Sequence, residues 1–269
     1  MNTKKQLIVI GGPTAVGKTS IAIKLAKHLK TEIISADSRQ FYKELSIGVN
    51  KPTTVELKEV KHHFIGHISV NKNYSVGQFE KDALTIIKQL FKKNNTLILC
   101  GGSGLYIDAV CEGLNDFPQV DQKIKKEINE KYLKKGLVYL QEELKKNDID
   151  SYNKIDINNP HRMMRVLSVF MASGTPYSYF IKTDKINREF QNTYISLNQK
   201  REKLYTTINQ RVDLMINNGL IEEARSLYKF KHIPSLQTIG YQEIFNHFDG
   251  KIKIDDAINQ IKQNSRRYA

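Results

Sequence analysis

The chain has 269 residues, of which 42 are Lys or Arg and 28 are Asp or Glu, giving a formal net charge of +14. This length is somewhat long for one compact unit, so we expect two domains or one domain with an insertion. No apolar segment is long enough to span a membrane and the N-terminus does not resemble a signal peptide, which predicts a cytoplasmic protein. The positive charge is compatible with a nucleic-acid partner, but a lysine-rich surface can also reflect genome composition.

The first predicted element is a strand that leads into a phosphate-binding loop. The apolar run 7–10 predicts the strand, and the pattern G-x-x-x-x-G-K-T follows it as Gly12, Pro13, Thr14, Ala15, Val16, Gly17, Lys18 and Thr19. The N–H groups of such a loop surround phosphate oxygens, and the helix that follows adds the positive end of its dipole. Lys18 supplies a mobile charge and Thr19 a hydroxyl for Mg²⁺. The loop therefore predicts a diphosphate or triphosphate ligand.

Two further buried strands are expected over residues 31–38 and 96–100. An NTPase normally ends the second of these with an acid that holds Mg²⁺ and orients water, whereas this chain continues with the glycine-rich segment 101–106. That absence favours a reaction in which diphosphate leaves over one in which a phosphoryl group moves. Asp37, near the phosphate loop, is then a candidate base, although its position fits a strand-end cap or a Mg²⁺ ligand equally well.

The side chains that could form redox or metal sites have ordinary interpretations. Cys100 and Cys111 lie in a predicted buried strand and the following helix, so we expect reduced core residues. His62, His63 and His67 cluster without a Cys or a carboxylate that would complete a metal-ligand pattern, so we expect ordinary strand or loop residues.

A change of composition near residue 116 predicts a helical insertion. Residues 121–155 are rich in Lys, Glu, Asp and Asn at helical spacing, which is typical of a solvated helix surface. We expect a core formed by residues 1–115 and 191–269, interrupted by a small helical domain over residues 116–190 that could close over the substrate.

A helix start is predicted at Asn159, because Asn is a good N-cap and Pro160 suits the first helical position. Arg162 and Arg165 near this start oppose the helix dipole, which indicates either an anion or base edge bound there, or pairing with nearby carboxylates. A strand over residues 193–198 and a helix with Leu204, Ile208, Val212 and Met215 on one face follow. Arg211 at the edge of that face suits a diphosphate or a salt bridge.

Six motifs together resemble those of the tRNA dimethylallyltransferases, over essentially the whole chain. They are Gly-Pro-Thr-Ala-Val-Gly-Lys-Thr at 12–19, Ser-Ala-Asp-Ser-Arg-Gln-Phe-Tyr at 35–42, Ile-Gly-Val-Asn-Lys-Pro at 47–52, Gly-Gly-Ser-Gly-Leu-Tyr at 101–106, Asn-Pro-His-Arg at 159–162 and Gly-Tyr-Gln-Glu at 240–243. The resemblance implies an α/β fold with a P-loop NTPase-like parallel sheet. It also implies transfer of a dimethylallyl group from dimethylallyl diphosphate to N6 of the adenosine 3′ to the anticodon. The tRNAs would read codons beginning with U, and the products would be N6-isopentenyladenosine and diphosphate.

The resemblance also implies roles for individual residues. Asp37 would act as the base, while Lys18, Ser103, Arg211 and the loop N–H groups would stabilise the leaving diphosphate, with Mg²⁺ on Thr19. Lys125 lies where the family usually has an arginine, which would exchange a bidentate contact for a single charge. The tRNA anticodon stem-loop would contact Asp37, Ser38, Arg39, Gln40, Ser103, Lys125, His161, Arg162, Met163, Met164, Arg165, Gln237, Thr238, Ile239, Gly240, Tyr241 and Gln242. We expect a monomer.

Other classes of protein remain open. An adenylate isopentenyltransferase or a P-loop nucleotide kinase would act on a free nucleotide, and a P-loop protein could bind RNA without catalysis. The missing strand-end acid disfavours the kinase, and the basic region 158–211, which includes Lys182 and Lys185, disfavours the adenylate enzyme. Family members usually continue past the position of Ala269 with a basic and an aromatic segment, so we expect a truncation relative to them that puts activity in doubt.

Overall fold

The structure is a computed structural model that describes residues 4–181 and 186–269. The chain divides into two compact units. Residues 1–112 and 187–269 form the core unit, and residues 113–186 form the inserted unit. Lys182 and Lys185 of the expected basic region lie outside the described residues.

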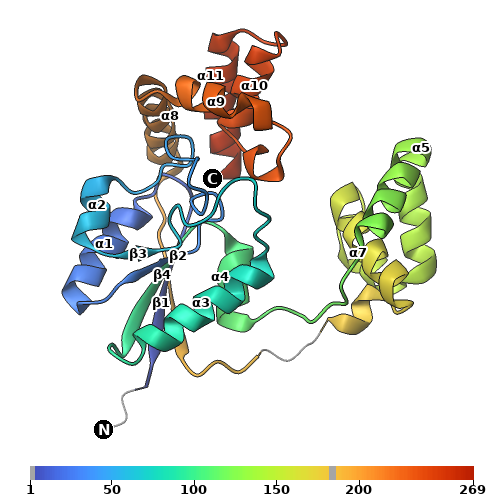
Figure 1. The fold of residues 1–269 in the computed structure, drawn as a ribbon, viewed down its shortest axis with the longest axis horizontal. Coiled ribbons are helices and arrows are strands. Elements are labelled where there is room, and N and C mark those ends of the chain that lie inside the picture. The colour runs from blue at the N-terminus through green and yellow to red at the C-terminus, as the bar shows by residue number, and fades with distance from the viewer. Residues whose placement is uncertain (1–3, 182–185) are drawn as a thin grey trace. The chain divides into compact units, whose positions relative to one another are not determined.

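The core unit is built on a five-stranded parallel sheet (Figure 1). Its strand order is β3 (His62–His63), β2 (Ile33–Ser35), β4 (Thr96–Cys100), β1 (Gln6–Gly11) and β5 (Gln191–Ser196). This confirms the predicted α/β fold with a parallel sheet. Strand β2 is shorter than the expected 31–38, because the chain turns at Asp37, where the carboxylate accepts a hydrogen bond from the Arg39 N–H at 3.1 Å.

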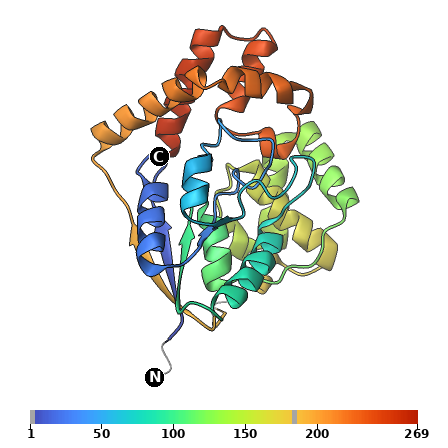
Figure 2. The ribbon, with the colours of Figure 1, turned by 60° about the vertical axis from the view of Figure 1, so that its left-hand side comes forward.

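Helices cover both faces of the sheet, as apolar residues on both sides of the strands require. Leu7 and Val9 of β1 pack with Phe79 and other residues of α3 (Val76–Leu90) and α4 (Gly104–Glu112). Ile10 packs on the other face with Ala22 of α1 (Lys18–Leu29). Figure 2 shows α1 and the α3–α4 pair on opposite sides of the strands. The short α2 (Thr54–Glu59) begins with a capping box between Thr53 and Glu56.

Four helices complete the core unit: α8 (Arg201–Asn217), α9 (Leu220–Leu227), α10 (Tyr241–Phe248) and α11 (Ile254–Tyr268), with 3₁₀ turns at Tyr228–Phe230 and Pro234–Leu236. They share a core with Leu45 and Val70 from the loops after β2 and β3. Leu204 and Ile208 of α8 pack on Ala15 of the phosphate loop. Helix α8 therefore packs directly against the phosphate loop. Within the described ranges, no helix is both long and apolar enough to cross a membrane.

The inserted unit is helical, with α5 (Gln122–Asn147), α6 (Ile149–Lys154), α7 (Pro160–Ser173) and a 3₁₀ turn at Tyr177–Phe180. Helix α5 is kinked at Gly136. Its core includes Ile128, Leu140, Leu144, Met163, Val166 and Leu167. Asn159 accepts a hydrogen bond from the Arg162 N–H at 3.2 Å, so the predicted cap and helix start of α7 are confirmed. This unit thus has its own hydrophobic core.

Candidate active site

The candidate site is a cleft of about 760 Å³ in the core unit, at the carboxyl ends of three neighbouring strands. Asp37 follows β2, Ser103 follows β4, and the phosphate loop follows β1. Because the carboxyl ends of parallel strands meet at one edge of a sheet, the order β2-β4-β1 brings the three segments together. All of them line the cleft.

The phosphate loop joins β1 to α1, as its sequence pattern predicted. Lys18 Nζ donates hydrogen bonds to the carbonyl oxygens of Gly12 and Pro13, at 2.9 and 2.7 Å. Burial lowers the pKa of Lys18, and the charge of Arg211 lowers it further, whereas Asp37 opposes the shift. Two partly buried cations thus share this end of the cleft, which favours an anionic ligand.

Arg211 of α8 reaches the phosphate loop across the cleft. Its Nη1 donates a hydrogen bond to the Thr14 hydroxyl at 3.1 Å. Burial lowers its pKa, and the charge that opposes this shift is that of Asp37. Among the described residues, no carboxylate lies within ion-pair distance of Arg211. Of the two alternatives for this residue, the geometry favours a bound anion over a salt bridge.

Asp37 faces the same cleft as the two cations. Burial raises its pKa, against the hydrogen bond from Arg39 and the charge of Lys18. A carboxylate with a raised pKa is a better proton acceptor when ionised. Asp37 is also the cap of the turn after β2, so the cap and the base are compatible roles for one carboxylate.

Ser103 is brought beside Asp37 and Ser38 by a close approach of two strand ends. A Cβ on Gly101 would lie 2.3 Å from the carbonyl oxygen of Ala36, so this position requires glycine. The Ser103 hydroxyl accepts a hydrogen bond from the Ser38 N–H at 3.0 Å and donates to the Ser38 hydroxyl at 3.1 Å. The glycine-rich segment therefore places a hydroxyl where an NTPase would place an acid.

The cleft also has an apolar wall that the sequence did not reveal. Met215 of α8 and Ile239 are its partly exposed residues, whereas Ile208, Val212 and Ile261, which also line it, are at most 2% exposed. Ile208 and Val212 thus belong to the core, as their stripe on α8 predicted, and Met215 of the same stripe also borders the cleft. Apolar periodicity cannot distinguish a residue that faces a core from one that faces a cleft, so the helical pattern alone could not find this wall. The cleft can accept a ligand with an anionic end and a small apolar end.

The donor groups at the loop fit Mg²⁺. Thr19 lines the cleft beside Lys18, and within the described part of the chain no three His, Cys, Asp or Glu side chains gather to hold a metal ion. Mg²⁺ is usually bound by one or two protein oxygens together with phosphate oxygens and waters. A single hydroxyl beside a phosphate loop satisfies that requirement, whereas a dedicated protein cage is not what this ion needs.

Two predicted RNA-contacting segments border the cleft, and one guanidinium links the first of them to the turn that precedes the second. Residues 38–40 and 238–240 line it. Arg39 Nη1 donates hydrogen bonds to the carbonyl oxygens of Pro234 and Ser235, at 3.2 and 3.1 Å. Segments distant in sequence are thereby held side by side.

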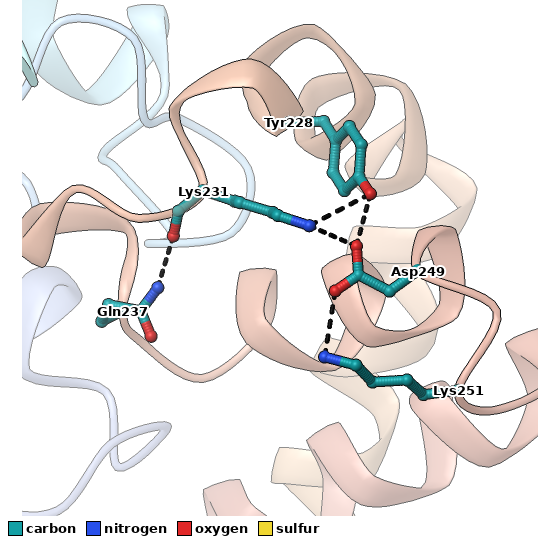
Figure 3. Close-up of polar contacts among 5 residues, drawn as sticks. All are labelled: Tyr228, Lys231, Gln237, Asp249 and Lys251. Carbon is teal, nitrogen blue, oxygen red and sulfur yellow. Dashed lines mark hydrogen bonds and ion pairs between the residues drawn. The ribbon is translucent and has the colours of Figure 1, made fainter.

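Gln237 and Gln242 are exposed, and they bond to each other at 2.6 Å. The Gln237 amide also donates to the Lys231 carbonyl oxygen (Figure 3). The Lys231 side chain in turn meets Asp249. Tyr241, by contrast, is fully buried, so its side chain supports this segment and offers no surface to RNA.

The remaining predicted RNA-contacting residues belong to the inserted unit. Lys125 of α5 is exposed, as are His161, Arg162 and Arg165 at the start of α7. The Arg165 guanidinium lies 5.3 Å from the centre of the Phe117 ring. No carboxylate among the described residues forms an ion pair with Arg162 or Arg165. Two methionines of this segment differ from the arginines: Met163 is fully buried in the unit's core and Met164 is partly buried.

The cysteines and the histidine cluster have the expected character. Burial raises the pKa of the Cys100 thiol to about 12, so it stays neutral beside Lys18 at neutral pH. Cys111 is also buried and free. His63 bonds to Glu32 at 2.6 Å and His62 to the Val60 carbonyl oxygen at 2.8 Å, so both have structural partners.

Comparisons with known proteins agree with this geometry. The model of the IPP transferase family matches residues 40–269. A tRNA dimethylallyltransferase of Christiangramia forsetii is 51% identical over 263 residues, which cover 98% of this chain and 87% of the relative. Its namesake in Flavobacterium johnsoniae is 48% identical over 98% of this chain and 88% of the relative.

Solved structures show the same likeness. The tRNA isopentenylpyrophosphate transferase of Bacillus halodurans matches with a TM-score of 0.70 and 36% identity, over 98% of this chain and 84% of the other. A eukaryotic dimethylallyltransferase acting on tRNA matches with a TM-score of 0.83 and 27% identity, over 98% of this chain and 68% of the other.

Proposed function

Because the chain belongs to the IPP transferase family, we propose that it is a tRNA dimethylallyltransferase. It transfers a dimethylallyl group from dimethylallyl diphosphate to N6 of the adenosine 3′ to the anticodon, in tRNAs that read codons beginning with U. It acts as a monomer on the anticodon stem-loop.

One observation carries the proposal: a phosphate loop, two cations, a carboxylate and an apolar wall share one cleft. Lys18, Arg211 and the loop N–H groups suit the diphosphate, as helix N-termini and guanidinium groups suit phosphate oxygens. The partly exposed Met215 and Ile239 of the apolar wall suit contact with a five-carbon prenyl chain. Asp37 lines the same cleft and would remove a proton from the amino group that reacts.

The reaction balances with the groups in the cleft. The lone pair of N6 forms a bond to C1 of the dimethylallyl group, while the bond from C1 to the diphosphate oxygen breaks. Asp37 takes one proton from N6 and later releases it to solvent. The diphosphate departs with the bonding electrons, and Lys18, Arg211 and Ser103 stabilise its charge.

An adenine amino group is a weak nucleophile, so positioning must contribute much of the rate. The target base must leave the stack of the anticodon loop to reach a buried carboxylate. Thr19 would hold Mg²⁺, which when bound would neutralise negative charge on the diphosphate. Lys125, Arg162 and Arg165 of the inserted unit are exposed cations, and they suit contacts to the loop bases and phosphates together with the exposed imidazole of His161.

Release of pyrophosphate tests the proposal and separates it from the alternatives. The protein would be incubated with Mg²⁺ and dimethylallyl diphosphate, together with an anticodon stem-loop carrying A at the target position. Parallel reactions would contain a stem-loop with G there, or AMP. We expect pyrophosphate only with the adenosine stem-loop. Efficient reaction with AMP would identify an adenylate isopentenyltransferase, and RNA binding without pyrophosphate release would identify a non-catalytic RNA-binding protein.

A further inference from the structure

Two of the family motifs, at 47–52 and 240–243, have no part in the chemistry described above. The structure places both beside the cleft, where Gly48, Val49 and Asn50 line one wall and Thr238, Ile239 and Gly240 line another. We call residues 46–50 the wall loop. One side chain outside the cleft forms hydrogen bonds with residues of both motifs.

That side chain is Glu223 of α9, which bonds through its carboxylate. Its Oε2 accepts hydrogen bonds from the Ser46 and Ile47 N–H groups at 3.1 and 2.9 Å, and its Oε1 accepts one from the Gly48 N–H at 3.0 Å. Oε1 also accepts a hydrogen bond from the Tyr241 hydroxyl at 2.6 Å. Hydrogen bonds to an ionised carboxylate are stronger than those between neutral groups. Four of them hold three consecutive residues and one buried phenol in fixed positions.

The wall loop also lies in close contact with Tyr241. A Cβ at position 48 would lie 2.6 Å from Cζ of the Tyr241 ring, so a side chain there would push the loop off the ring. Tyr241 is the first residue of α10 and directly follows Gly240 of the cleft. Glu223 therefore fixes two walls of the cleft through one set of hydrogen bonds, although it does not line the cleft itself.

The other edge of the wall loop holds Gln40, a predicted RNA contact. The Gln40 Nε2 donates to the carbonyl oxygens of Val49 and Asn50, at 3.2 and 3.0 Å. Carbonyl oxygens only accept hydrogen bonds, so these two partners require the NH₂ end of the amide. The amide orientation is thereby determined, and Oε1 is the atom that Gln40 can offer to a hydrogen-bond donor of a ligand in the cleft.

We propose that Glu223 is a positioning residue for RNA: through the wall loop it fixes the Gln40 amide so that its oxygen accepts a hydrogen bond from a base of the bound anticodon loop. This inference rests on the proposed function, because the donor is an RNA base. The inference predicts different effects on the binding of the two substrates, because Glu223 holds the walls near Gln40 and Gly240 but none of the groups assigned to the diphosphate.

The test compares Glu223→Gln with Glu222→Gln, which removes the same charge from an exposed neighbour on the same helix. Gln has one acceptor oxygen where Glu has two, so at least one N–H group of the wall loop loses its partner. The affinities for the anticodon stem-loop and for pyrophosphate with Mg²⁺ would be measured separately. We expect Glu223→Gln to weaken stem-loop binding roughly tenfold and to leave pyrophosphate binding within about twofold. Glu222→Gln should change neither.

A second readout needs no RNA. Hydrogen–deuterium exchange over residues 44–52 should be faster in Glu223→Gln than in wild type or Glu222→Gln. Tyr241→Phe, which removes one of the four hydrogen bonds and keeps the ring, should give a smaller change of the same kind. This variant tests the inference even if Glu223→Gln does not fold.

Three results would overturn the inference. Wild-type stem-loop affinity in Glu223→Gln would show that the wall loop does not orient an RNA contact. An equal loss of stem-loop and pyrophosphate binding would show a general structural role. If wild-type protein does not bind the stem-loop at all, the proposed function fails and this inference fails with it, whereas the first two results leave the function intact.

Discussion

At the scale of single residues, the site depends on groups whose ionisation is shifted by burial. Burial raises the pKa of Asp37 and lowers the pKa values of Lys18 and Arg211. Burial of each charge alone would destabilise the folded protein, but the negative charge of Asp37 and the positive charges of Lys18 and Arg211 partly compensate for one another. An anionic ligand supplies the remaining compensation for the two cations. This arrangement makes Asp37 a base whose strength is set by its surroundings.

Asp37 must be ionised to take a proton, so its raised pKa predicts the acid limb of the pH profile. The single-turnover rate should be highest above that pKa and should fall as the pH decreases through it. Because the pKa is raised, the fall should occur at higher pH than for an ordinary aspartate, whose pKa is about 3.9. Rapid-quench measurements with the stem-loop across this range would show it.

Asp37→Asn should lower the single-turnover rate about 10²–10⁴-fold and remove this acid limb. Stem-loop affinity, measured in parallel, should change little. Asparagine can still accept the Arg39 hydrogen bond, so the turn after β2 is retained. A wild-type rate in Asp37→Asn would remove this residue from the mechanism.

At the scale of elements, helix ends present much of the proposed binding surface. The start of α7 shows this: Asn159 caps the helix, and the side chains of Arg162 and Arg165 project from its first turns into solvent. The cap satisfies an N–H group that would otherwise need a partner. The two arginines therefore project from a capped helix end, which the buried side chains of Met163 and Val166 anchor to the core of the inserted unit.

Removal of this cap should destabilise α7. Asn159→Ala should cost about 1 kcal/mol of helix stability, measured as faster hydrogen–deuterium exchange over residues 160–168. Asn158→Ala is the matched control, because Asn158 is an exposed neighbour that does not cap the helix. Equal exchange in the two variants would contradict the contribution assigned to the cap.

The exposed arginines of α7 should contribute to RNA binding. Arg162→Ala and Arg165→Ala should each weaken stem-loop binding by about 1–3 kcal/mol if a base contact is lost. A contact to phosphate alone should instead lower the slope of log K against log salt by about one. Titrations at several salt concentrations distinguish these effects. Lys146→Ala, which removes an exposed cation from another part of the same unit, should change affinity less, and unchanged affinity in both arginine variants would contradict the assignment.

At the scale of the whole molecule, ligand binding and stability are linked. Pyrophosphate with Mg²⁺ should bind the folded core unit and not the unfolded chain, which stabilises the protein by about 2.7 kcal/mol at a ligand concentration of 100 Kd. A stabilisation of this size should raise Tm by several degrees. Thermal unfolding with and without the ligand would measure the shift.

The matched variants for this measurement are Lys18→Ala and Lys27→Ala. Both lie on α1, but Lys27 forms an exposed ion pair with Glu59 away from the cleft. We expect Lys18→Ala to lose most of the Tm shift and Lys27→Ala to keep it. A full shift in Lys18→Ala would show that the phosphate loop is not where pyrophosphate binds.

Local signals in the sequence predicted those parts of the molecule that are determined locally. The run 96–100 became β4, and Asn159 became a cap, because strand periodicity and capping depend on neighbouring residues. The phosphate loop lies between β1 and α1 as its motif required. The sequence also indicated that Arg211 needs a partner, but its contact with Thr14 depends on how α8 packs.

Features that depend on tertiary packing could not be predicted in the same way. Met215 continues the apolar stripe of Ile208 and Val212, and its spacing is the same whether it faces the core or the cleft. Tyr241 looked like an accessible part of a motif, whereas it is fully buried. Glu223 carried no signal at all, since its partners lie far away in sequence at 46–48 and 241. Only the folded chain shows these relationships.

The position of β5 has a consequence for how the protein is made. Strand β1 lies between β4 and β5, and Gln6 at its start pairs with Gln191. The N-terminus of the chain leaves the ribosome first, so one edge of β1 stays unpaired until the whole inserted unit has been synthesised. Exposed strand edges invite pairing with other chains, and such distant pairing folds slowly. The inserted unit, with its own core, can fold during that interval, so the nascent chain should be most prone to aggregate between the synthesis of β4 and the arrival of β5.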